Sequence, residues 1–174
     1  MMKYGLLCLT VFLVGCAALG SKTTIHNNAR VKEIRTVGLI TKRFNQPRNS
    51  YHELIKARFT RDLMERLNQK NLFNVVVLDT MENEGLDIKS YKTDAQIDAF
   101  LVAEWKLSHP QSVVSDAKVQ LSLVDNETKE LLIVSSHGTK FGNSYWWTPA
   151  LPKTLLDATE GSLNALEKNL KSMR

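Results

Sequence analysis

The stretch AKVQLSLVDNETKELLIV, residues 117–134, decides the expected fold. Apolar and polar side chains alternate from Ala117 to Val124, which is typical of a strand with one buried and one solvated face. The polar run DNET, residues 125–128, predicts a turn, and the apolar run Leu131–Val134 predicts a second strand after it. The stretch therefore predicts an antiparallel hairpin.

Three further strands are predicted before the hairpin. Val31–Ile40 is rich in β-branched residues and predicts a strand that runs from solvent into the core. Val75–Leu78 is wholly apolar, as expected of a strand buried on both faces. Asp98–Leu107 is mostly apolar and predicts another interior strand. The polar segment Thr80–Thr93, which contains a glycine, predicts a loop with at most a short helix.

Two long helices are indicated by apolar residues at three- and four-residue spacing. Ser50 and Glu53 form a capping-box pattern that predicts a helix start, and Asn71 is a suitable left-handed terminator for that helix. The second helix begins near Pro152 and closes the chain. The apolar positions are Tyr51, Leu54, Ile55, Phe59, Leu63 and Leu67 in the first helix, and Leu155, Leu156, Thr159, Leu163, Leu166 and Leu170 in the second.

Together these elements predict an α/β (α+β) domain over residues 31–174. It would have one mixed sheet of about five strands with helices packed on it, in the order strand, helix, strand, short helix, three strands, helix. The chain has 174 residues, of which 43% are hydrophobic and 24% charged, and this composition excludes disordered, collagen-like and disulfide-scaffold classes. The net charge of +5 falls short of a nucleic-acid-binding patch, so no nucleic-acid partner is expected.

The first 15 residues have the features of a secretory signal peptide. Met1–Lys3 is basic, and Gly5–Val14 is apolar but shorter than the roughly 20 residues that span a membrane. The junction Leu13, Val14, Gly15 and Cys16 resembles the bacterial lipoprotein signal, in which the thiol is acylated and the cysteine becomes the mature N-terminus. The alternative is a plain secreted protein in which Cys16 happens to lie near the cleavage site.

Cysteine usage supports acylation of Cys16. Cys8 leaves with the signal peptide, so one thiol remains, and lipidation consumes it. Residues 16–30 are then predicted to be the lipidated cysteine and a short flexible tether. Acyl chains on Cys16 would bind the membrane. The residue after the cysteine is Ala17 rather than aspartate, which by resemblance to enterobacterial lipoproteins favours the outer membrane.

The order of elements resembles the fold of the curli secretion lipoprotein CsgG, which the penicillin-binding-protein activator LpoB and the N-terminal domain of TolB share. The matching pieces are Val37–Ile40, Leu72–Asp79, Asp98–Glu104 and the hairpin Val119–Val134. The resemblance implies a periplasmic, membrane-tethered domain that works by contact and has no catalytic residues. The chain lacks the additional amphipathic strands that a pore requires, and its tether is short compared with that of the synthase activator.

The sequence also contains no pattern typical of catalysis. His26, His52, His109 and His137 are scattered, and the zinc-protease pattern that His52 begins has Lys56 where the second histidine belongs. Neither a glycine-rich phosphate loop nor a nucleophile elbow occurs. We therefore expect no enzyme activity, no catalytic residue, no bound metal and no cofactor.

Two segments are candidate contact sites. The loop Phe141–Pro149 contains Tyr145, Trp146 and Trp147, and aromatic rings on a loop are typical of interface hot spots and of membrane interfaces. The alternative is that this loop folds back and packs on the sheet. The first long helix has a basic face that could contact lipid headgroups or an acidic partner, or could simply be solvated. Its residues are Lys56, Arg58, Arg61, Arg66 and Lys70.

These features favour a non-enzymatic lipoprotein, anchored at the outer membrane, that acts as an accessory or assembly factor by contact with an unidentified envelope protein. The alternative is an oligomer-forming structural envelope lipoprotein related to secretion-channel components, which would bind further copies of itself.

Overall fold

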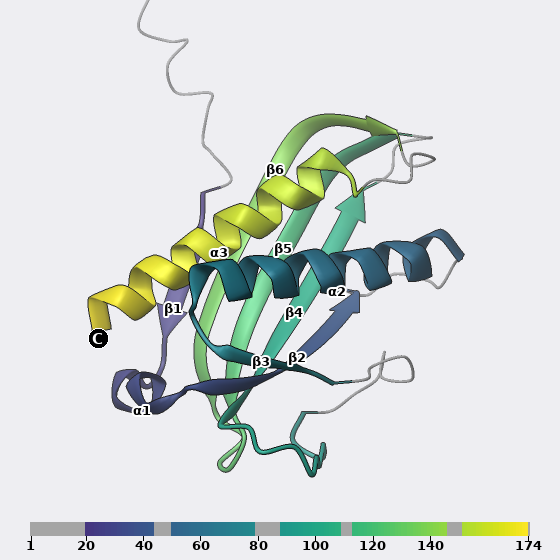
Figure 1. Cartoon of the computed structure of the whole chain (residues 1–174). Helices are drawn as coiled ribbons and strands as arrows, with labels where there is room; N and C mark the ends of the chain where they lie inside the picture. Colours follow the sequence, from purple (N-terminus) through teal and green to yellow (C-terminus); the bar gives the residue numbers. More distant parts are fainter. Residues whose placement is uncertain (1–19, 44–49, 79–87, 109–112, 146–150, 174) are drawn as a thin grey trace, which may run out of the picture.

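Six strands form one mixed sheet in the computed structural model, which describes residues 20–43, 50–78, 88–108, 113–145 and 151–173. The strand order is β1-β6-β5-β4-β2-β3, and three helices complete the described part of the chain (Figure 1). The predicted α+β class with a single mixed sheet is confirmed, with six strands instead of about five. The elements are β1 (Lys22–Ile25), α1 (Asn28–Glu33), β2 (Thr36–Arg43), α2 (Ser50–Lys70), β3 (Asn74–Val77), β4 (Ala99–Ser108), β5 (Val113–Asp125), β6 (Leu131–Tyr145) and α3 (Lys153–Met173).

The predicted hairpin is formed by β5 and β6. Leu121 lies opposite Ser135 and Leu123 opposite Ile133, so the predicted alternation places the leucines on one face. Both strands are longer than the sequence indicated. The Asp125 carboxylate stabilises the turn, because its Oδ1 accepts the backbone N–H groups of residues 127 and 128 at 2.7 and 2.8 Å.

The strands on the other side of β4 are parallel. β2 pairs in parallel with both β3 and β4, and α2 connects β2 to β3. The helix begins at Ser50, as the capping pattern predicts, and ends at Lys70. Asn71 follows with a φ of 49°, which confirms it as the left-handed terminator.

One face of the sheet carries the main core. Figure 1 shows α2 and α3 lying side by side across this face. Trp105 of β4 is 1% exposed and packs on Phe59 of α2, with 6.1 Å between the ring centroids. A smaller cluster lies under the 88–98 segment, where Phe100 and Tyr91 meet edge to face at 5.5 Å. The rest of the second face has no helix over it among the described residues.

The N-terminal segment differs from the prediction. Residues 22–25 form β1, an edge strand antiparallel to β6, and residues 28–33 form α1, although 16–30 was expected to be a tether. Val31 and Ile34 therefore belong to α1 and its C-terminal end, not to the predicted strand. Asn27 caps this helix, because its Oδ1 accepts the Arg30 N–H at 3.1 Å. Sequence periodicity could not detect such short elements.

The strand at residues 74–77 is not buried on both faces as predicted. Among the described residues β3 is an edge strand, paired with β2 alone, and its Val76 and Val77 side chains are 37% and 45% exposed. An apolar run four residues long cannot by itself distinguish an edge strand from an interior one. The segment Thr80–Thr93 was expected to be a loop with at most a short helix. Residues 88–90 form a turn, residues 91–93 have no regular secondary structure, and the rest lies outside the described residues.

Small and hydroxylated residues bring α3 close to β5 and β6. Ser162 Oγ donates to the Val119 carbonyl at 2.9 Å, and Ser135 Oγ donates to the Ser162 carbonyl at 2.9 Å. The His137 ring lies against Gly161, where an added Cβ would be 2.4 Å from ring atoms. Ser21 Oγ lies 2.8 Å from His137 Nδ1 and donates to the Gly161 carbonyl at 3.2 Å. Ser21, the residue before β1, thus contacts both β6 and α3.

The Gly161→Ala substitution tests this close approach. Alanine has a helix propensity about 1 kcal/mol better than glycine, but its Cβ would overlap the His137 ring near the strand backbone. We expect a net loss of about 1–2 kcal/mol in the free energy of unfolding. In a His137→Ala background the same change should be neutral or stabilising, because the ring is gone. Equal effects in both backgrounds, measured by urea denaturation, would contradict the proposed contact.

Candidate functional site

A polar row crosses the sheet face opposite α2 and α3. We call it the uncovered face, because no helix of the described residues lies over it. The strand register places Lys42 beside Glu104, Glu104 beside Gln120, Gln120 beside Ser136, and Ser136 beside Lys22. Because side chains alternate along a strand, these five residues point away from the buried residues 101, 103, 105, 119 and 121 on the helix-covered face. The uncovered face is therefore polar where the 88–98 segment does not cover it.

Glu104 is the centre of this polar row. Lys42 Nζ lies 3.0 Å from Glu104 Oε1, and Gln120 Nε2 donates to Glu104 Oε2 at 3.1 Å. The side chains of Lys42 and Glu104 are 27% and 16% exposed, so this ion pair is half-buried. Both carboxylate oxygens and the Lys42 ammonium are thus already engaged in contacts within the sheet.

The next row of the same face contains two lysines that lie directly opposite each other. Lys106 of β4 pairs with Lys118 of β5, and Gly138 of β6 comes next in the row. Both lysines are exposed, and no ion pair with a carboxylate is found for either among the described residues. Like charges at directly opposed positions of an antiparallel pair destabilise it. The glycine leaves the far side of the lysine pair without a side chain.

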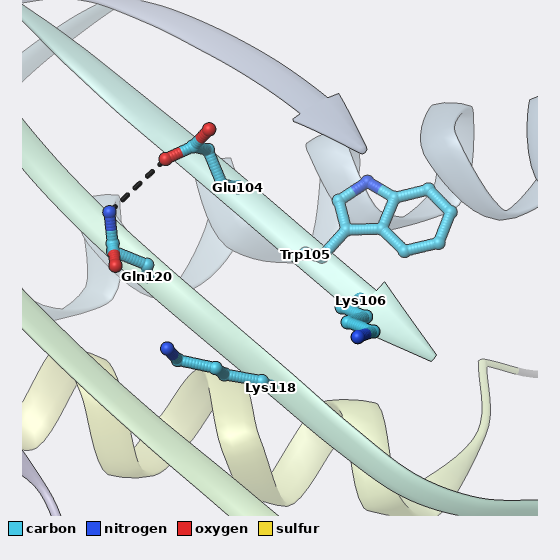
Figure 2. Close-up of a pocket in the computed structure, with 5 residues that line it drawn as sticks. All are labelled: Glu104, Trp105, Lys106, Lys118 and Gln120. Carbon is cyan, nitrogen blue, oxygen red and sulfur yellow. Dashed lines mark hydrogen bonds between the residues drawn. The ribbon is translucent and has the colours of Figure 1, made fainter. Parts of the chain in front are cut away.

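These lysines border a shallow hollow of about 140 Å³ (Figure 2). Figure 2 shows Lys106 and Lys118 on neighbouring strands, next to the hydrogen-bonded Glu104 and Gln120. The lining residues are Glu104, Trp105, Lys106, Lys118 and Gln120.

The face around the hollow has an excess of positive charge. Among residues with described side chains, the register places four lysines and two carboxylates on it, and Glu104 is already paired with Lys42. The lysines are Lys22, Lys42, Lys106 and Lys118, and the carboxylates are Glu104 and Asp116. The hollow is therefore suited to an anion.

The contact between Ser21 and His137 is the only arrangement among the described residues that resembles part of a catalytic site. A serine nucleophile needs a base that a third group orients, and no described hydrogen bond orients the His137 ring from its other nitrogen. Ser21 is moreover hydrogen-bonded to the Gly161 carbonyl. No group of three His, Cys, Asp or Glu side chains in the described part of the chain could hold a metal ion. The contact between Ser21 and His137 therefore joins the N-terminal segment to the domain.

The predicted basic face of α2 is not one solvated surface. Arg66 Nε lies 2.8 Å from Asp62 Oδ2, and Arg66 Nη1 lies 2.8 Å from Glu160 Oε2. Lys70 Nζ lies 3.2 Å from Glu160 Oε1 and 3.0 Å from Glu167 Oε2. Burial alone would raise the pKa of Glu160, but Lys70 and Arg66 outweigh it and lower that pKa. These two basic residues therefore hold α2 against α3. Of the remaining predicted residues, Lys56 and Arg58 are half-buried and Arg61 is exposed.

Of the other predicted site residues, Tyr145 alone belongs to the described part of the chain. Cys16, Trp146 and Trp147 lie outside the described residues. Tyr145 is the last residue of β6, so the segment 141–145, which was predicted to be a loop, is strand. The proposed roles of these four residues in lipidation and binding stay predictions.

The lysine pair at the hollow was missed by sequence reasoning. Lys118 was recognised as a solvated residue of an alternating strand, but Lys106 lies within a run interpreted as interior strand. Their juxtaposition depends on the register between β4 and β5, which the sequence does not specify.

Comparison with known proteins finds structures with a similar fold but no matching family. No protein-family model and no curated protein matches the sequence. A PelC variant from Paraburkholderia phytofirmans, solved as a dodecamer, is similar in structure with a TM-score of 0.52 and 9% identity, over 84% of this chain and 96% of that one. The hypothetical protein CT253 from Chlamydia trachomatis is similar with a TM-score of 0.51 and 10% identity, over 80% of this chain and 99% of that one. At these identities the likeness concerns the fold alone.

None of the helices in the described residues is both long and apolar enough to span a membrane.

Proposed function

We propose that this chain is a lipoprotein of the bacterial cell envelope, anchored through Cys16 with the outer membrane favoured, which acts without catalysis as an accessory or assembly factor. The lipoprotein-type junction at residues 13–16 supports the anchor. β1 begins at Lys22, six residues after Cys16, and six extended residues span at most about 20 Å. An anchored domain would therefore work close to its membrane.

The observation that carries a role by contact is the outer edge of β3, with which no strand of the described residues pairs. The Asn74 N–H donates to the carbonyl of Arg35, the residue before β2, at 2.8 Å, and the Leu78 N–H donates to the Leu39 carbonyl of β2 at 3.1 Å. In a parallel ladder, the backbone groups of the intervening residues Val75 and Val77 then point away from β2. An edge with unpaired backbone groups and exposed apolar side chains is a template for a strand of another chain. Val76 and Val77 supply those side chains.

The anchor is tested by labelling cells with a fatty acid and fractionating the envelope. We expect label on the wild-type protein and on a Cys8→Ser control, because Cys8 lies in the signal segment. In the Cys16→Ser variant we expect the label to be lost and the protein to leave the membrane fraction. Wild-type protein without label, or a Cys16→Ser variant that keeps it, would refute the lipid anchor.

A second candidate function is that of a structural homo-oligomer. β1 covers β6 only at residues 133–136, so residues 137–145 of β6 have no strand on that side among the described residues. In the part of the chain that the structure describes, the sheet thus has an unpaired edge at each end, and contacts between two different edges can close into a ring. The structurally similar PelC is itself a dodecamer, which is compatible with self-assembly here.

Substitution of the exposed valines distinguishes the two candidates. In a Val76→Lys, Val77→Lys variant, lysines on the edge should prevent strand addition with little effect on folding. If the homo-oligomer is correct, the full chain in detergent should fall from an assembly to a monomer, as measured by light scattering. A Leu131→Lys control, which changes an exposed apolar residue next to the β5–β6 turn, should leave the assembly intact. A wild-type monomer, or a double variant that still assembles, would count against self-assembly through β3.

A further inference from the structure

We propose that the hollow between Lys106 and Lys118 is a binding site for a phosphoryl group, a ligand that neither the fold nor the proposed anchoring function assigns. Two ammonium groups on directly opposed strand positions border the hollow. Lysine binds phosphate as a compact point charge, and a phosphate monoester carries about −1.5 to −2 charges near neutral pH. The two positive charges of the pair match that charge, whereas a single carboxylate would neutralise only one of them.

The nearby carboxylate of Glu104 is occupied by other contacts, so Lys106 and Lys118 are the groups that would bind the ligand. Glu104 is the nearest carboxylate along β4, but Lys42 and Gln120 engage both of its oxygens. It is thereby held in the adjacent row and does not neutralise the lysine pair. Asp116 lies one row further along the same face, and no ion pair joins it to either lysine among the described residues, so the positive charge of the pair is available to an external anion.

The surroundings of the pair also leave space for the rest of a ligand. Gly138 follows Lys118 in the row and has no side chain, so a group attached to the phosphoryl can extend over β6. No helix of the described chain covers this face (Figure 1). Since opposed lysines weaken the β4–β5 pairing, the arrangement gains stability when an anion lies between them.

The experiment titrates the full chain, purified in a nonionic detergent, with inorganic phosphate and separately with dihexanoyl phosphatidic acid. Sodium chloride at the same ionic strength is the control for screening. We expect phosphate at ten times its Kd to raise Tm by about 3 °C, whereas chloride does not. Binding of both probes indicates recognition of the phosphoryl group itself, and binding of the phosphatidic acid alone indicates a lipid headgroup as its source.

A matched pair of double variants locates the site. Lys106→Gln with Lys118→Gln should weaken phosphate binding by about tenfold or more, because both charged donors are lost. Lys153→Gln with Lys168→Gln removes the same two charges from α3 and should change binding by less than about twofold. A wild-type protein that binds neither probe, or a β4–β5 double variant that binds as tightly as the wild type, would overturn the proposal.

A charge reversal separates loss of binding from loss of folding. Lys106→Glu places opposite charges on the facing positions, so we expect Tm without phosphate to equal or exceed that of the wild type. The same variant should lose the phosphate-induced rise in Tm. A Lys106→Glu variant that keeps this rise would refute the role of Lys106.

Discussion

Replacing Asp125 with alanine is expected to lower the free energy of unfolding by about 3 kcal/mol. The side chain of Asp125 is fully buried, and its Oδ1 accepts two backbone N–H groups in the β5–β6 turn. Its Oδ2 accepts from Arg30 Nε of α1. Alanine would remove all three contacts and leave their donors without the carboxylate, so the turn and the attachment of α1 should weaken together.

Two further variants separate the parts of this effect. Asp125→Asn keeps an oxygen for the turn but loses the charge, so its loss should be about half as large. Arg30→Ala removes a side chain that is 33% exposed, and should have the smallest effect of the three. Urea denaturation measures each. Equal losses for Asp125→Ala and Arg30→Ala would contradict a separate contribution from the turn hydrogen bonds.

The contribution of Asp125 should also depend on pH in a defined direction. Burial alone would raise its pKa, but the hydrogen bonds donated by Thr128, Arg30 and Glu127 outweigh burial and hold the pKa below the ordinary value of 3.8. A carboxyl group with a lowered folded-state pKa stabilises the fold above its ordinary pKa, and this stabilisation is lost as pH falls through the folded-state pKa. The difference in stability between the wild type and Asp125→Asn should therefore shrink below about pH 4.

Replacing Trp105 with alanine should cost about 3–5 kcal/mol of unfolding free energy. Trp105 is among the largest fully buried side chains and lies between β4 and α2, where it packs on Phe59. A cavity at this place would loosen the contact between the sheet and α2. Denaturation in urea, followed by circular dichroism, measures the loss.

The exposed residue Val77 provides the control for Trp105→Ala. Val77→Ala also shortens an apolar strand residue, but the valine is 45% exposed, so its effect should stay within about 0.5 kcal/mol. Trp105→Phe keeps most of the buried apolar volume and should fall between the two. A Trp105→Ala variant as stable as Val77→Ala would show that the indole is not part of the core.

The sequence predicted the long elements because their periodicity is strong. The alternation from Ala117 to Val124, the apolar spacing of the two long helices and the terminator Asn71 all correspond to observed structure. The four-residue strand β1 was missed, because it is too short for a pattern and depends on pairing with β6. The exposure of β3 was missed because its place at the sheet edge is a property of topology.

The candidate site was less predictable than the fold. Arg66 and Lys70 were grouped with a solvated basic face, but the packing of α3 brings Glu160 and Glu167 to them. The opposition of Lys106 and Lys118 results from the register of two strands, and a shift of one residue would place them on opposite faces. Contacts between residues distant in the sequence decide both cases.

Native mass spectrometry of the full chain, released from solubilised envelopes, tests the central proposal most directly. We expect a mature chain that begins at Cys16, carries the mass of added acyl chains, and is recovered in a complex with an envelope protein or with further copies of itself. An unacylated monomer that still contains residues 1–15 would contradict both the anchor and the role by contact.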